Sequence, residues 1–274
     1  MTQPGPFSSA LASGSATQSP SASRWFDRYA AMTTAEAKLF IRQPVVLFFQ
    51  VAFPVLLLVL FGAMFSDVPL GEGNGRMVID FYLPALIGAF VAQAGLVSMP
   101  IFLANYRKLG VLKRYHVSPV SLSTYLAVHV TVQVASMLLT AMVMTGVGKL
   151  LFDVTMPQNL LGVLGVGVLG MAAFFAFGFA LSGVLPSPQA GQAVGNFLFL
   201  TMFFLSGATI PHGMFPGWLE TLSYALPLTH VVQPMADLWL GRPATPHLVS
   251  FLIVAALIPL GILVAKQVFS WKEH

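Results

Sequence analysis

The chain has 274 residues, of which 57% are hydrophobic and only 8% are charged, whereas soluble domains carry roughly 25% charged residues. This composition excludes an ordinary soluble domain and indicates a polytopic membrane protein. The formal net charge of +4 does not predict a nucleic-acid partner, because the basic residues are spread over the ends of apolar segments instead of one soluble face. Cysteine is absent, which excludes disulfides and thiolate metal sites.

The first two segments of the chain differ in character. Residues 1–23 are rich in small and polar residues, carry no charged side chain and lack a signal-peptide core, so we expect a disordered cytoplasmic tail. In residues 24–43, Trp25, Tyr29 and Met32 recur at helical spacing among basic side chains. This pattern predicts an amphipathic helix in the lipid headgroup layer. A plain soluble helix before the first span is the alternative.

Residues 44–274 contain six apolar segments, each near or above the roughly 20 residues that cross a bilayer as a helix. They predict an all-α domain of six transmembrane helices, at about 45–65, 81–103, 122–151, 160–185, 190–210 and 248–269. Pro54, Pro84 and Pro259 lie inside or near the ends of these spans. They predict kinks, which are tolerated where neighbouring helices satisfy the freed carbonyls.

The distribution of Lys and Arg predicts the orientation of the chain. Ten of these residues lie near the two termini or in the 105–119 segment, and three, Arg76, Lys149 and Arg242, lie on the other side. Short cytoplasmic loops concentrate basic residues. We therefore expect both termini in the cytoplasm.

Residues 105–119 form a basic segment without an acidic residue, between the second and third spans. Ser118 can cap the next helix with Pro119 at its first position, which makes a stiff corner. We interpret the segment as a cytoplasmic loop helix that binds a cytosolic partner through complementary charge. The alternative is that its basic side chains only anchor helix ends to anionic lipid.

Residues 205–241, between the fifth and sixth spans, are still apolar but are interrupted by Pro211, Pro216 and Pro227. Non-helical backbone at membrane depth must be covered by protein or water. The segment therefore predicts two short re-entrant or outer-leaflet helices on the external side.

Three stretches of the sequence, taken in order, resemble the ABC-2 type permeases, which are membrane subunits of ATP-binding cassette exporters such as those for daunorubicin-like drugs. They are residues 42–54 with 60–62, residues 106–121, and residues 205–207 with 211, 214–216, 226–232 and 240–241. The resemblance implies a bacterial inner-membrane protein that pairs with a second permease subunit, identical or different, and with two copies of a cytosolic ATPase. ATP and magnesium would be bound by that ATPase, and no cofactor by this chain.

The resemblance also implies site residues. The loop helix would couple to the ATPase through Arg107, Lys108, Gly110, Lys113, Arg114 and Pro119. The second and fifth spans would line a cavity, where Gln93, Asn196, Phe199 and Phe203 are candidate contacts for a hydrophobic cargo. His129 and Gln133 are an i, i+4 pair on the third span, either a path feature or a polar seam. Ser206, Gly207, Pro211, Pro216 and Pro227 would belong to the exit side.

The predicted function is therefore a permease subunit without an ATPase site of its own, which moves a drug, lipid or polyketide-like substrate outward. Residues 146–150 do not form a phosphate loop, because Val143 stands at the first glycine position and Leu150 at the Ser/Thr position. One alternative is an ion-coupled carrier, although the acidic residues fall in loops or at span ends. The other is an intramembrane hydrolase that would use Ser206 and His230. The histidines are too scattered for a zinc site.

Overall fold

The computed structural model describes residues 22–70, 75–108, 122–210 and 215–268. Most of the predicted tail and loop helix, with Gly110, Lys113, Arg114 and Pro119, lies outside the described residues, as does Pro211. The described part is helical throughout, without a strand, and its only sheet-like contact is an isolated bridge between Pro69 and Met77.

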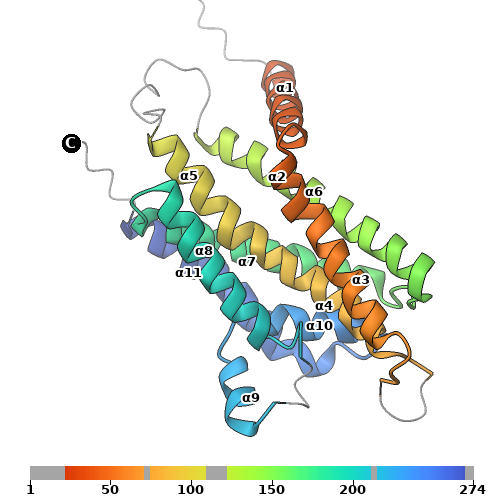
Figure 1. Ribbon diagram of the computed structural model, residues 1–274. Coiled ribbons are helices and arrows are strands. Elements are labelled where there is room, and N and C mark those ends of the chain that lie inside the picture. The colour runs from red at the N-terminus through yellow and green to blue at the C-terminus, as the bar shows by residue number, and fades with distance from the viewer. Residues whose placement is uncertain (1–21, 71–74, 109–121, 211–214, 269–274) are drawn as a thin grey trace, which may run out of the picture.

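Figure 1 shows a bundle of helices in which α1 lies at the end where α5 finishes and α6 begins, with α9 at the opposite end. The elements η1 and η2 are π-helical and η5 is a 3-10 turn. In chain order the elements are α1 (Ala22–Ile41), α2 (Pro44–Leu47), η1 (Phe48–Ala52), α3 (Phe53–Phe65), α4 (Val78–Gln93), η2 (Ala94–Ser98), α5 (Met99–Lys108), α6 (Leu122–Phe152), α7 (Leu160–Val184), α8 (Pro188–Leu205), α9 (Gly217–Ser223), α10 (Thr229–Trp239), η5 (Thr245–His247) and α11 (Leu248–Val268).

Five of the six predicted spans are confirmed as helices long and apolar enough to cross a membrane. They are Pro44–Phe65, Val78–Asn105, Ser123–Phe152, Leu160–Val184 and Thr245–Gln267. The predicted fifth span is the 18-residue helix α8, which packs along α5. It does not reach the same hydrophobicity because Gln189, Gln192 and Asn196 lie in its first half. A total of six spans therefore stays a prediction.

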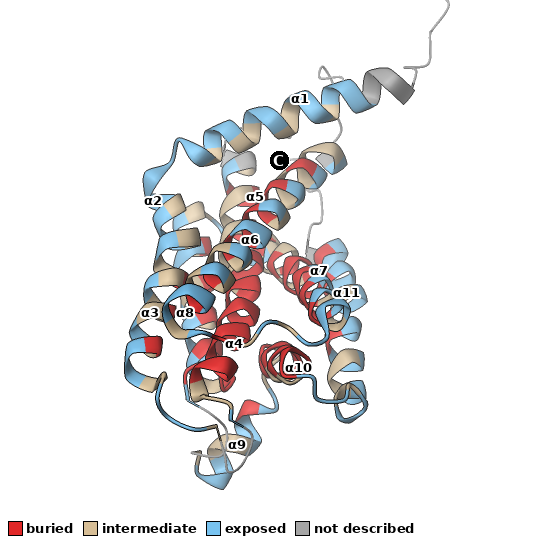
Figure 2. Ribbon diagram, turned by 90° about the vertical axis from the view of Figure 1, so that its right-hand side faces the viewer, coloured by how far each residue is buried: buried red, intermediate tan, exposed pale blue. Residues whose placement is uncertain are grey.

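The segment formed by α4, η2 and α5 is the centre of the bundle. Within its span, 72% of the apolar window is buried, against 17% for the first and the last span. Figure 2 shows α4 and α10 as the most buried helices, while α3, α8 and α11 expose long faces. Leu83, Leu86 and Phe90 are among the largest fully buried side chains.

The stretch after α8 does contain two short helices, α9 and α10, as its prolines predicted. The helix α10 packs against α4 and α7, and its apolar side chains Val231, Val232 and Met235 are almost fully buried. It is therefore part of the protein core, whereas Trp218 and Leu222 of α9 are exposed. The re-entrant depth of these helices in a membrane stays a prediction.

The ends of α8 and α10 follow from their sequences. Ser187 accepts a hydrogen bond from the Ala190 N–H at 3.1 Å, and Pro188 takes the first helical position, where its missing N–H has no cost. Gly207 and Gly241, just past the two C-termini, have φ values of 86° and 73°. This left-handed conformation is the usual helix stop and favours glycine.

Each π-helical segment ends two residues before a proline: η1 before Pro54 and η2 before Pro100. A proline inside a helix has no N–H to donate, and its ring crowds the carbonyl four residues earlier. A local widening of the helix accommodates the ring. Pro54 has no N–H to donate to the Gln50 carbonyl. That carbonyl instead accepts a hydrogen bond from the Thr140 hydroxyl on α6 at 3.0 Å. A hydroxyl on a neighbouring helix therefore lies within hydrogen-bond distance of the carbonyl that Pro54 leaves without its usual donor.

Replacing Thr140 by valine should lower the free energy of unfolding by about 1 kcal/mol, because it removes the hydroxyl that serves the Gln50 carbonyl and the Ser136 carbonyl. The measurement is thermal unfolding of the purified protein in detergent. Thr145→Val is the matched control, since the Thr145 hydroxyl bonds only within its own helix, to the Ala141 carbonyl. Equal losses in the two variants would contradict a special role for Thr140.

Candidate substrate cavity

A cavity of about 580 Å³ lies between α1, α2 and η1 on one side and α4, η2, α5, α6 and α8 on the other. This volume is in the range of sites for drug-sized ligands. Its polar lining consists of Glu36, Gln43, Gln50, Gln93, Ser98, Asn105, His129, Gln133, Gln192 and Asn196. Its aromatic lining consists of Phe40, Phe49, Phe53, Phe102 and Phe199.

The structure brings the predicted path residues together. Gln93, His129, Gln133, Asn196 and Phe199 all line this cavity. Phe203 does not line it, but its ring stacks on that of Phe199, with 5.5 Å between the centroids. The second, third and fifth predicted spans therefore contribute to one cavity, which suits either a ligand path or a polar seam.

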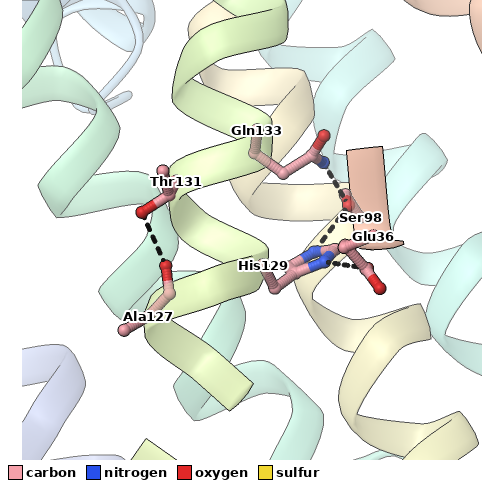
Figure 3. A network of polar contacts seen from close by, with 6 residues as sticks. All are labelled: Glu36, Ser98, Ala127, His129, Thr131 and Gln133. Atoms are coloured by element: carbon pink, nitrogen blue, oxygen red, sulfur yellow. Dashed lines mark hydrogen bonds and ion pairs between the residues drawn. The ribbon is translucent and has the colours of Figure 1, made fainter. Parts of the chain in front are cut away.

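Figure 3 shows a chain of polar contacts along the wall of the cavity. The Gln133 amide N–H donates to the Ser98 hydroxyl. The Ser98 hydroxyl lies 3.2 Å from His129 Nε2, and His129 Nδ1 lies 3.4 Å from the Glu36 carboxylate. Because a carboxylate only accepts, His129 Nδ1 is the donor in its contact with Glu36. His129 and Gln133 are thus a polar seam that also lines the cavity.

The same contacts fasten α1 to the bundle. Besides the Glu36–His129 pair, the Tyr29 hydroxyl lies 2.5 Å from the Thr131 hydroxyl of α6. The Phe102 ring stacks on the His129 imidazole, with 3.8 Å between the ring centroids. A helix in the place of the predicted amphipathic segment is therefore present and forms one wall of the cavity. Its position in the headgroup layer stays a prediction.

The amides of the cavity fall into two groups. Gln50 donates to the Ser136 hydroxyl at 3.2 Å and is therefore held by α6. In the described part of the chain, Gln93, Gln192 and Asn196 make no side-chain hydrogen bond with the protein. These three amides can each donate to and accept from a bound molecule.

Arg107 has a different environment from the one predicted for a loop residue. Its guanidinium donates to the Ser182 carbonyl and, at 3.0 Å, to the Leu185 carbonyl at the end of α7. Burial lowers the pKa of Arg107 from its ordinary value. These charge-assisted bonds tie the last turn of α5 to the turn before α8. Lys108 is the last residue of α5.

The predicted hydrolase pair is not assembled. The Ser206 hydroxyl donates to the Phe203 carbonyl in its own helix at 3.3 Å. His230 lies 2.9 Å from the Tyr224 carbonyl through Nε2 and 3.0 Å from the Ser250 hydroxyl through Nδ1. Gly207 ends α8, Pro216 precedes α9 and Pro227 precedes α10. The described residues of the predicted exit side, Ser206, Gly207, Pro216 and Pro227, thus lie in or next to turns between helices.

Asp80 is the one buried acidic residue in the described ranges, with 4% of its surface exposed. One carboxylate oxygen accepts from the Thr155 N–H at 2.7 Å and from the Thr155 hydroxyl at 2.9 Å. The other accepts from the Met77 N–H at 2.8 Å. Asp80 does not line the cavity and instead caps the first turn of α4.

Residues 146–150, which the sequence did not predict to be a phosphate loop, have no loop geometry. Residues 146–150 lie within the continuous helix α6, whereas a phosphate loop needs successive backbone N–H groups that converge on the phosphates. Among the described residues, no group of three or more His, Asp or Glu side chains could hold a metal ion.

Several helices apolar enough to span a bilayer, with a ligand-sized cavity between them, are consistent with a multi-pass membrane protein. The sequence pattern of the ABC-2 type transporter family matches residues 28–238, and the chain belongs to this family. That range contains every residue of the cavity. The family predicted from the three sequence stretches is confirmed.

Two relatives illustrate the range of this family. The chain is 28% identical over 208 residues to a putative transport permease, ycf38, of Cyanophora paradoxa. The aligned region covers 72% of this chain and 69% of that protein. The chain is 24% identical over 191 residues to a probable doxorubicin resistance ABC transporter permease protein, DrrC, of Mycobacterium tuberculosis, covering 65% of this chain and 67% of that protein.

Proposed function

We propose that this chain is the permease subunit of an ATP-driven exporter, with six spans and both termini in the cytoplasm of a bacterial cell. It moves a hydrophobic or amphipathic molecule out of the cytoplasm or the inner leaflet. The observation that carries the proposal is the cavity, because its walls combine phenylalanine rings with the free amides of Gln93, Gln192 and Asn196. Such a lining takes up an apolar body and still hydrogen-bonds its polar substituents.

The energy is supplied by a separate ATPase, present in two copies, which binds ATP and magnesium. A second permease subunit completes the membrane part. The family membership supports this division of labour, since the relative named DrrC is a permease protein of an ABC transporter.

The contacts of Arg107 suggest how a displacement of the predicted loop helix at residues 105–119 would be transmitted to the cavity. Arg107 joins the end of α5 to the turn that begins α8. The helix α5 continues from η2 and α4, which carry Ser98 and Gln93, while α8 carries Asn196. Two walls of the cavity are therefore held together at the end that would receive the force.

Affinity purification of the tagged chain in mild detergent should recover a P-loop ATPase. Replacing Lys113 and Arg114 by glutamate should lower that recovery at least about tenfold, because reversed charge opposes association. Lys266→Glu, a charge reversal at the end of α11, is the matched control and should leave recovery unchanged.

Two other outcomes are informative. If no ATPase is recovered even after crosslinking, the exporter proposal is wrong, and the ion-coupled carrier becomes the better hypothesis; its transport would stop with an uncoupler and continue after ATP depletion. Recovery without release keeps the exporter and assigns Lys113 and Arg114 to lipid anchoring.

A further inference from the structure

Glu36 is the only Asp, Glu, Lys or Arg among the described residues that line the cavity. It lies on α1, and 31% of its side chain is exposed. The rest of the polar lining consists of amides, one hydroxyl and one imidazole. The fixed charge of the lining is therefore negative and comes from a single carboxylate.

This charge is not compensated by a fixed cation in the described part of the chain. The one ion-pairing distance below 4 Å that Glu36 makes there is the 3.4 Å contact with His129. The hydrogen-bond chain runs from Gln133 through Ser98 to His129, whose Nδ1 donates to Glu36. His129 thus positions the carboxylate.

The aromatic lining, like the negative charge of Glu36, favours a cation over an anion. Five phenylalanine rings border the cavity, and the faces of such rings attract cations, particularly where water is scarce. Phe49, Phe53 and Phe199 come from η1, α3 and α8, so they surround the space from more than one side. A bound anion would meet a carboxylate of the same sign.

We propose that the cavity selects cationic amphiphiles, meaning molecules with an apolar aromatic body and a positively charged group, and that Glu36 is the residue that determines this specificity. The proposal rests on the proposed function, since it takes the cavity as the substrate site. The positive group binds beside the Glu36 carboxylate, and the apolar body lies against the phenylalanine rings.

The test uses two ions of nearly equal size and shape but opposite charge, tetraphenylphosphonium and tetraphenylborate. Their binding to the full-length chain, purified in detergent together with any ATPase that accompanies it, is measured by equilibrium dialysis. The wild type should bind the phosphonium at least about tenfold more tightly than the borate. Glu36→Gln should weaken phosphonium binding about tenfold, since it removes the charge while keeping the shape.

Two further variants separate the site from general effects. Asp27→Asn removes a charge from the same helix outside the cavity lining and should leave both affinities unchanged. Glu36→Asp keeps the charge and should retain the preference for the cation. An unchanged melting temperature of Glu36→Gln shows that the loss is not one of folding.

Failure would have distinct forms. Equal binding of the two ions, or phosphonium binding that is unaffected by Glu36→Gln, would overturn the charge selection while leaving the cavity as a binding site. If neither ion binds the wild type, the selection of cations is also overturned. The exporter itself is then judged separately by the capture of the ATPase, which does not depend on either ion.

Discussion

Replacing Asp80 by alanine should lower the free energy of unfolding by about 4 kcal/mol, the largest effect expected of any single substitution considered for this chain. The carboxylate is almost fully buried and accepts three hydrogen bonds, two from Thr155 and one from Met77. Thr155 in turn accepts a hydrogen bond from the Trp239 indole at 2.8 Å. Alanine would leave buried donors unpaired at the point where α4, α10 and the turn that follows α6 meet.

Asp80→Asn distinguishes this structural role from a role in ion coupling. Asparagine keeps one acceptor oxygen for Thr155 but cannot accept from Met77, so we expect a loss of about 1 to 2 kcal/mol and transport close to that of the wild type. Thermal unfolding in detergent and transport in vesicles are the two measurements. A folded Asp80→Asn protein without transport would favour the carrier, and an unchanged melting temperature of Asp80→Ala would contradict the capping role.

Gly178→Ala should lower the free energy of unfolding by about 3 kcal/mol, because there is no room for a side chain where α7 crosses η2. A Cβ atom at Gly178 would overlap the carbonyl oxygen of Gly95, and a backbone atom cannot move aside as a side chain does. The expected observation is a lower melting temperature and a broadened elution profile in detergent.

Gly165→Ala on the same helix is the matched control. A Cβ atom there would meet nothing within 4 Å, and alanine is the better helix former by about 1 kcal/mol. We expect its melting temperature to be unchanged or higher. If the two variants unfolded alike, close packing at Gly178 would not be what limits the approach of α7 to η2.

Hydropathy was enough to predict most of the membrane helices, since a helix that crosses lipid must be apolar over its whole length. It failed to separate α8 from a fully apolar span, although Gln189, Gln192 and Asn196 lie in the first half of this helix. The sequence also predicted two short helices after α8 but not that α10 is buried in the core. Its burial depends on α4 and α7, which no local pattern in residues 229–239 specifies.

The site was partly predictable. The spacing of His129 and Gln133 placed them on one face, and both line the cavity with Gln93 and Asn196. Glu36 was missed, because it is far from His129 in the chain and reads as one residue on the polar face of an amphipathic helix. The coupling role predicted for Arg107 stays a prediction, and its contacts with two backbone carbonyls were not foreseen. The basic sequence around Arg107 could not predict these contacts, because the carbonyls belong to Ser182 and Leu185, which are distant in the chain.

The two π-helical segments set which side chains line the cavity. A π-helical turn contains one residue more than an α-helical turn, and one residue corresponds to a rotation of about 100° around the axis. Since η1 carries Gln50 and η2 carries Ser98, moving either bulge along its helix would turn different side chains toward a bound molecule. The lining could then change its chemistry while the ends of both helices stay in place.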